Sequence, residues 1–100
     1  MITIKRVDSG DGIIKMEMRD GDVILCEGAA AVRGDSARVL EVTAPEYAFE
    51  MGKALLNCMD LRGIKNVYWD ADHADSAAKL GFVSGYLDLT GYFRKKCEGC

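Results

Sequence analysis

Apolar and charged residues alternate along the first third of the chain. Between Ile14 and Arg19 every second residue is apolar and the others are charged, which is the period of a half-buried β-strand. The dipeptide Asp20-Gly21 follows, and it readily adopts the positive φ angles of a type I′ turn. Residues 23–26 are apolar again, so the pattern predicts an antiparallel hairpin.

The second strand of this hairpin is predicted to continue to Val32, with Gly28 as a weak point or bulge. Residues 33–36 form a second turn, and residues 37–43 form the next strand. Residues 2–4 add an edge strand. Together these segments predict an antiparallel meander.

The hydrophobic period changes near Pro45. Residues 43–46 have the spacing of a capping box, and apolar residues then recur at helical intervals up to Gly63. We predict one long helix from about Glu46 to Arg62, which ends where a glycine can adopt the left-handed conformation.

The last third returns to strand-forming residues. Residues 64–69 are β-branched and aromatic, which favours a strand. A short helix over residues 74–80 is closed by Gly81, and residues 82–89 and 92–97 are predicted to form a final hairpin.

A crossover that carries a helix joins parallel strands. Residues 37–43 should therefore lie parallel to residues 64–69. The predicted class is α/β (α+β): a mixed sheet with an antiparallel N-terminal meander, one parallel strand-helix-strand unit, a short second helix and a C-terminal hairpin.

Composition is that of one globular domain over residues 1–100. The chain has 100 residues, is 49% hydrophobic and contains 1 proline. It has no apolar run near the roughly 20 residues that span a bilayer and no signal-peptide pattern, so we expect a cytoplasmic protein without membrane partners.

Charge and cysteine content exclude some classes. A net charge of -3 with one basic cluster, residues 94–96, is not a nucleic-acid footprint. Cys26, Cys58, Cys97 and Cys100 are expected to be reduced thiols. Cys97 and Cys100 have the spacing of half a zinc site or a redox pair, but the rest of such a site is missing, which favours an incidental pair in a frayed tail. No metal is expected.

Four stretches of sequence carry a family resemblance. They are Leu-Glu-Val-Thr-Ala-Pro at 40–45, Met-Gly-Lys-Ala-Leu-Leu at 51–56, Arg-Gly-Ile-Lys-Asn-Val-Tyr at 62–68 and Ala-Lys-Leu-Gly-Phe at 78–82. In this order and spacing they resemble the C-terminal half of the GNAT superfamily of N-acetyltransferases. The resemblance covers roughly residues 13–97.

This resemblance implies acetyl-CoA as co-substrate and a primary amine as acceptor. The strand before the long helix would pair with the pantetheine arm, and the start of the helix would hold the pyrophosphate. Glu41 would be either the general base that takes a proton from the amine or, as favoured here, a solvated outward residue of an alternating strand. The residues implied in cofactor binding are Leu40, Val42, Thr43, Tyr47, Glu50, Met51, Gly52 and Lys53.

The chain departs from the family pattern at key positions. The phosphate signature falls on Tyr47, Glu50 and Gly52, of which only Gly52 agrees with it, and the Glu50 carboxylate opposes an anion. The family's tyrosine general acid falls on Ala77. Residues 5–13 leave no room for the two helices that follow the first strand in the family. We therefore expect weak binding of CoA.

A second group of candidates follows the strand over residues 64–69. Asp70, Asp72, His73 and Asp75 are hard-metal ligand types, yet their spacing lacks the glycine and the distal glutamate of a calcium loop. Capping of the short helix by Asp72 or Asp75 is the better interpretation. His73 is either a base for the acceptor or, as favoured here, a solvated loop residue.

Two functions from different classes follow. The first is an acetyl-CoA-dependent N-acetyltransferase; the second is a GNAT-like module that has lost catalysis and serves binding or dimerisation. A homodimer is expected because the missing helices would leave apolar surface uncovered. That surface comprises Ile14, Met16, Met18, Val23 and Leu25.

Overall fold

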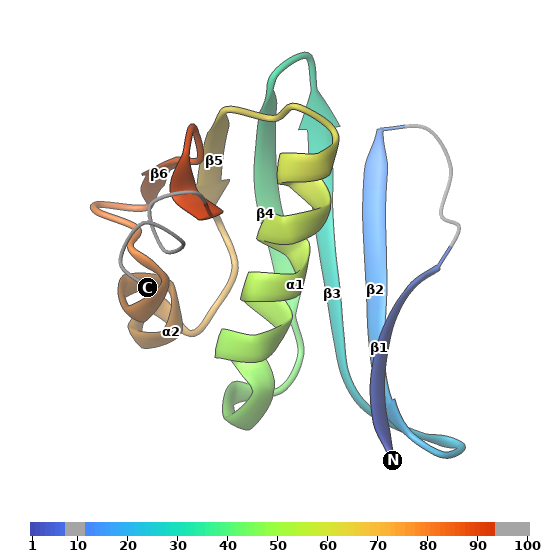
Figure 1. Cartoon of the computed structure of the whole chain (residues 1–100). Coiled ribbons are helices and arrows are strands. Elements are labelled where there is room, and N and C mark those ends of the chain that lie inside the picture. Colours follow the sequence, from blue (N-terminus) through green and yellow to red (C-terminus); the bar gives the residue numbers. More distant parts are fainter. Residues whose placement is uncertain (8–11, 94–100) are drawn as a thin grey trace.

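The computed structural model describes residues 1–7 and 12–93. Within them, six strands form one sheet in the order β1-β2-β3-β4-β5-β6 (Figure 1). The elements in chain order are β1 (Ile2–Val7), β2 (Ile13–Asp20), β3 (Val23–Arg33), β4 (Ser36–Val42), the 3-10 turn η1 (Pro45–Tyr47), α1 (Ala48–Leu61), β5 (Asn66–Trp69), α2 (Ala74–Leu80) and β6 (Tyr86–Asp88).

The predicted mixed sheet is confirmed. Strands β1 to β4 form the antiparallel meander, and its tight turns place Gly21 and Gly34 at φ angles of 60° and 61°, which glycine adopts without strain. Strand β4 lies parallel to β5, with Ser36 opposite Asn66 and Val39 opposite Trp69. Helix α1 makes the crossover between these two strands.

The prediction of a bulge at Gly28 is wrong. The β2–β3 register shifts between Met18 and Arg19, and the β3–β4 register shifts between Ala29 and Ala30. Gly28 has a different role, because a Cβ atom there would lie 2.7 Å from Met51 Cγ. Its missing side chain lets α1 approach the sheet.

The long helix begins later than predicted. Pro45 opens a 3-10 turn and α1 proper starts at Ala48, with no side-chain cap at either start. The predicted capping box does not form, since the Thr43 hydroxyl accepts a hydrogen bond from the Glu27 N–H at 2.9 Å. A bond to the neighbouring strand has replaced the helix cap.

The short helix α2 is confirmed, but its N-cap residue is His73, and no side chain caps it. The predicted final hairpin differs from the structure. Strand β6 pairs antiparallel with β5, and Val83 forms a bridge with Tyr86. Tyr92 and Phe93 are helical rather than extended, because Tyr92 N–H bonds back to the Leu89 carbonyl. The remainder of the predicted last strand, with Cys97 and Cys100, lies outside the described residues.

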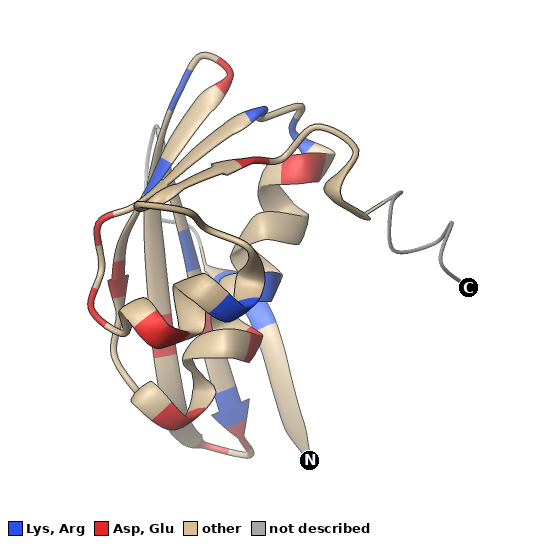
Figure 2. Cartoon of the chain, turned by 90° about the vertical axis from the view of Figure 1, so that its left-hand side faces the viewer, with Lys and Arg blue, Asp and Glu red and all other residues tan. Residues whose placement is uncertain are grey.

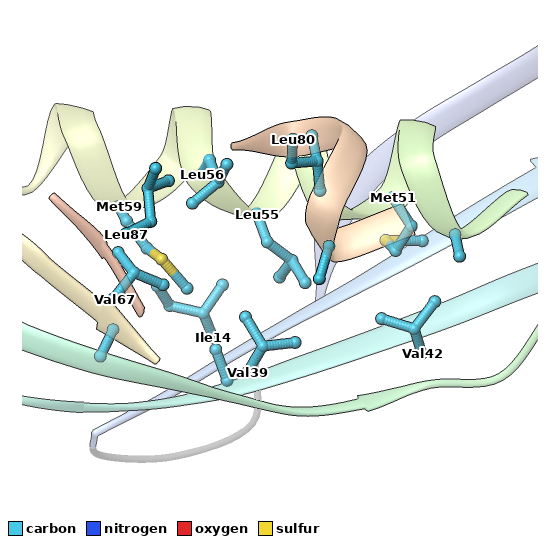
Figure 3. Close-up of a cluster of buried hydrophobic side chains, with 14 of the residues drawn as sticks. Ile14, Val39, Val42, Met51, Leu55, Leu56, Met59, Val67, Leu80 and Leu87 are labelled. Carbon is cyan, nitrogen blue, oxygen red and sulfur yellow. The ribbon is translucent and has the colours of Figure 1, made fainter. Parts of the chain in front are cut away.

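Both helices lie on the same side of the sheet (Figure 2). On that side Ile14, Ala30 and Val39 stand side by side across three strands and are 0% exposed. The side chains of α1 and α2 close the core above them (Figure 3). We call this the covered face, and the opposite side the bare face.

Two of the residues expected to lie in uncovered apolar surface are core residues. Ile14 is 0% exposed and Met18 2%, because α1 packs across β2 and β3. Met16 and Leu25 pack against the core in part, and Val23 is exposed. Neither helix in the described part of the chain combines the length and apolarity needed to cross a bilayer.

Candidate functional site

Strand β4 continues past the end of β5, and we call the place where β4 loses this partner the gap. Their last register pair is Val39 opposite Trp69, after which the Asp70 N–H donates to the Val39 carbonyl at 2.8 Å. Strand β4 continues to Val42, whereas the chain beyond Trp69 turns away as a loop over residues 70–73. The edge of β4 beyond Val39 therefore faces this loop instead of a strand.

A bulge lies at the point of separation. Ala30 pairs with Val39 and Ala29 pairs with Glu41, so Leu40 is the extra residue of β4. Such a residue stands outside the regular ladder of hydrogen bonds. Its side chain is 43% exposed.

The loop over residues 70–73 is tied across the gap. The Nε2 of His73 lies 3.0 Å from the Val42 carbonyl oxygen, which only accepts, so Nε2–H donates. The indole N–H of Trp69 donates to the Asp72 carbonyl at 3.0 Å. His73 itself has a φ of 70°, a strained value for a residue other than glycine. His73 is half-buried, which overturns its interpretation as a solvated loop residue.

Gly52 on α1 faces Leu80 of α2 and Trp69 of β5. A Cβ atom there would lie 2.6 Å from Leu80 Cδ1 and 3.3 Å from the Trp69 ring. Gly52 and the preceding Met51 are both buried. These two residues therefore serve the contact of α1 with α2 and the sheet.

The start of α1 adjoins a pocket of about 370 Å³, lined by Pro45, Glu46, Phe49, Glu50, Ser76 and Lys79. Two carboxylates and one ammonium group line it. Two of the N–H groups nearby are already in use, since Tyr47 N–H donates to the Ala44 carbonyl and Ala48 N–H to the Pro45 carbonyl. Pro45 has no N–H to offer.

The molecule is similar to the crystal structure of the ribosomal-protein-S18-alanine N-acetyltransferase from Escherichia coli. The TM-score is 0.67 at 15% sequence identity, and the match covers 83% of this chain and 78% of that chain. The fold is GNAT-like. No protein-family model and no curated protein matches the sequence.

Within this GNAT-like fold the implied site residues divide between two faces. Val42, Met51 and Gly52 are buried on the covered face. Glu41 is exposed and pairs with Ala29 on the bare face. The structure thus brings residues 40–43 to the gap, but it does not bring the candidate base to the start of α1.

The remaining implied residues have ordinary structural surroundings. Tyr47 is half-buried and packs against the core, and Lys53 is half-buried on α1. Thr43 and Glu50 are exposed. Ala77, at the position of the family's tyrosine acid, is 5% exposed. Within residues 1–7 and 12–93 no three His, Cys, Asp or Glu side chains gather in an arrangement that would hold a metal.

A second cluster lies on the bare face, where Arg38, Tyr68 and Tyr86 stand in register on β4, β5 and β6. The Arg38 guanidinium carbon lies 5.5 Å from the Tyr68 ring centre, and the two tyrosine rings are 5.3 Å apart. The Tyr86 hydroxyl donates to Asn66 Oδ1 at 2.7 Å. Partial desolvation, then the Asp88 carboxylate and Tyr68, raise the pKa of Tyr86.

Sequence reasoning missed this cluster. The three residues lie on strands separated by a crossover helix and a second helix, so no local spacing connects them. The available signal was weak: Arg38 and Tyr68 occupy positions that alternate with buried residues of their strands.

Proposed function

We propose that this chain acts as a single GNAT-like domain that has lost acetyl transfer and works as a binding module. The observation that carries the proposal is the hydrogen bond from His73 to the Val42 carbonyl. It occupies the edge of β4 at the gap, where the family resemblance places the pantetheine arm. Any molecule that pairs with this edge must first displace the loop.

The charge at the start of α1 supports the same conclusion. Glu46 and Glu50 line the pocket with the single cation of Lys79, and the N–H groups of Tyr47 and Ala48 at the helix start are already bonded. Acetyl-CoA carries several phosphate charges that such a pocket repels. The acyl-CoA group therefore does not fit the residues present at its phosphate end.

Calorimetric titration of the full chain with acetyl-CoA and with CoA tests this proposal. We expect no binding at micromolar concentration. The Glu50→Gln variant should gain affinity by about 1 kcal/mol or less, because it removes one screened like charge. Asp60→Asn, an equally exposed acid at the other end of α1, is the matched control and should change nothing. Low-micromolar binding by the wild type would overturn the proposal.

One observation favours an enzyme as the second candidate. The bulge at Leu40 lies beside the gap, and a backbone N–H released from the ladder there would polarise a thioester carbonyl. Such an enzyme would transfer acetyl from acetyl-CoA to a primary amine, with Glu41 accepting the amine proton. Acetylation of a panel of primary amines would then be detectable with the wild type and lost with Glu41→Gln; the module predicts no acetylation by either protein.

We also propose that the module works in the cytoplasm as a homodimer. Edge strand β1 carries Ile2 and Ile4, which are 53% and 36% exposed, and Val23 nearby is 61% exposed. Two copies related by a two-fold axis would pair these edges antiparallel and cover the apolar side chains. Sedimentation at micromolar concentration tests this: Ile4→Lys should convert a dimer into a monomer, and a wild-type monomer contradicts the pairing.

A further inference from the structure

The bare face has a hollow where β3 ends and β4 begins, beside β5. The hollow has a volume of about 300 Å³ and is lined by Ala31, Arg33, Ser36, Ala37, Arg38 and Tyr68. Ala31 forms its floor because its short side chain leaves the space above the backbone unfilled, whereas Ala37 points its side chain into the core. Its volume suits a small ligand of one ring.

Arg38 is held in place at the edge of this hollow. Its guanidinium lies over the Tyr68 ring at 5.5 Å from the centre, and Tyr86 packs on Tyr68. The hydrogen bond from Tyr86 to Asn66 fixes the second ring. A cation stacked on an aromatic face loses less conformational freedom when it binds an anion.

The two arginines have spare capacity for an anion. Arg38 has one ion pair, to Asp70, with the charged atoms 3.7 Å apart. The side chains of Arg38 and Asp70 are 54% and 62% exposed. Arg33 is exposed and has no ion-pair partner among the described residues. A guanidinium presents a planar fork of donors that matches carboxylate and phosphate oxygens.

From these observations we propose that the hollow binds a small anion attached to a planar ring, as in an aryl carboxylate or an aryl phosphate. Arg38 and Arg33 hold the anionic group, and the ring lies on Ala31 beside the edge of Tyr68. The Ser36 hydroxyl, on the hollow's rim, makes a long hydrogen bond of 3.5 Å to Asp35 Oδ1 and would exchange it for one to the anion. The proposal goes beyond the module function, and it does not depend on whether the gap between β4 and β5 binds acyl-CoA.

Chemical-shift titration of the full chain by NMR tests the site. The probes are phenyl phosphate, benzoate, inorganic phosphate and neutral phenol. We expect either ring anion to shift the amide signals of β3 and β4 around Ala31 and Arg38, with an affinity at least tenfold above that of inorganic phosphate or phenol. The tighter of phenyl phosphate and benzoate identifies the preferred anionic group.

Variants separate charge from shape. Arg38→Gln removes the fork and Ala31→Leu fills the floor, and each should weaken the binding of the preferred probe at least tenfold. Asp70→Asn removes the competing carboxylate and should tighten it severalfold. Arg62→Gln, a matched loss of one exposed cation at the end of α1, should leave affinity unchanged.

The outcomes that overturn the proposal are distinct. If inorganic phosphate binds as tightly as phenyl phosphate, the ring has no place in the site. If Arg38→Gln and Ala31→Leu both bind like the wild type, the shifts arise elsewhere. The probes contain no CoA, so a negative result in this titration does not bear on the calorimetric test of the binding-module proposal.

Discussion

The covered face and the bare face are built from the same strands but differ in how far their side chains are buried. Ile14, Ala30 and Val39 on the covered face are fully buried, and their contribution comes from apolar area removed from water. On the bare face Arg38, Tyr68 and Glu41 remain exposed and have no helix above them. The comparison indicates that side chains of the covered face supply the stability of the fold. Side chains that could bind a ligand can vary on the bare face.

The sharpest test of this division replaces a buried leucine of the covered face and an exposed leucine of β4 by alanine. Leu55 of α1 is 0% exposed, and Leu40 of β4 is 43% exposed. Leu55→Ala should lower the free energy of unfolding by about 2–5 kcal/mol, because it leaves a cavity in the core. Leu40→Ala should cost less than about 1 kcal/mol. Urea denaturation measures the free energy of unfolding of both variants. Similar losses would contradict the assignment of stability to the covered face.

Two neighbouring residues on β3 test the division with smaller side chains. A side chain at Gly28 meets Met51 at 2.7 Å and Leu55 at 3.2 Å, so Gly28→Val should destabilise by about 1–3 kcal/mol through overpacking. Ala29 lies on the bare face. Ala29→Val should be neutral or slightly stabilising in the same denaturation experiment.

Tyrosines on the two sides give a smaller contrast that depends on pH. The Tyr92 hydroxyl donates to the Leu80 carbonyl at 2.7 Å, and burial raises the pKa of Tyr92 above 10.0. As pH rises the unfolded chain loses this proton first, so the stabilisation is complete below about pH 10 and is lost as pH passes the folded-state pKa.

Tyr92→Phe should therefore lower stability by about 1 kcal/mol at neutral pH and flatten the alkaline loss. Tyr86→Phe, on the bare face, should change both quantities less, because its hydrogen bond to Asn66 is exposed to solvent. Thermal denaturation between neutral pH and pH 11 compares the two. A steeper alkaline loss in Tyr92→Phe than in the wild type contradicts the assignment.

The smallest expected effect concerns the ion pair between Arg38 and Asp70. Its atoms are 3.7 Å apart and both side chains are exposed, so Asp70→Asn should change stability by less than about 0.5 kcal/mol. The same variant is expected to tighten anion binding at the hollow. A large loss of stability would mean that this pair supports the fold.

The sheet could be predicted because its signals are local. Alternation from Ile14 to Arg19 and the change of period near Pro45 predicted the strands and the parallel crossover. The helix start was missed because the Thr43 hydroxyl bonds to the Glu27 N–H on another strand. The burial of Ile14 was not predicted because α1 covers it. The sequence of the meander does not show where α1 crosses β2.

The candidate site was less predictable for the same physical reason. His73 bonds to a carbonyl 31 residues away, and Arg38, Tyr68 and Tyr86 meet only after two helices have been placed. The family resemblance implied that the strand before the long helix pairs with a pantetheine arm, but it did not predict the loop that occupies the edge of this strand. Contacts between distant segments decide whether a site is open, and spacing along the chain does not encode them.

The loop tied to Val42 also has a kinetic consequence. A ligand for the edge of β4 cannot bind at the rate of diffusional encounter, because two hydrogen bonds and a strained residue must first rearrange. The rate of association would then reach a plateau at high ligand concentration, set by how often the loop opens. A variant engineered to bind acyl-CoA tightly would still fill slowly, unless His73 were replaced as well.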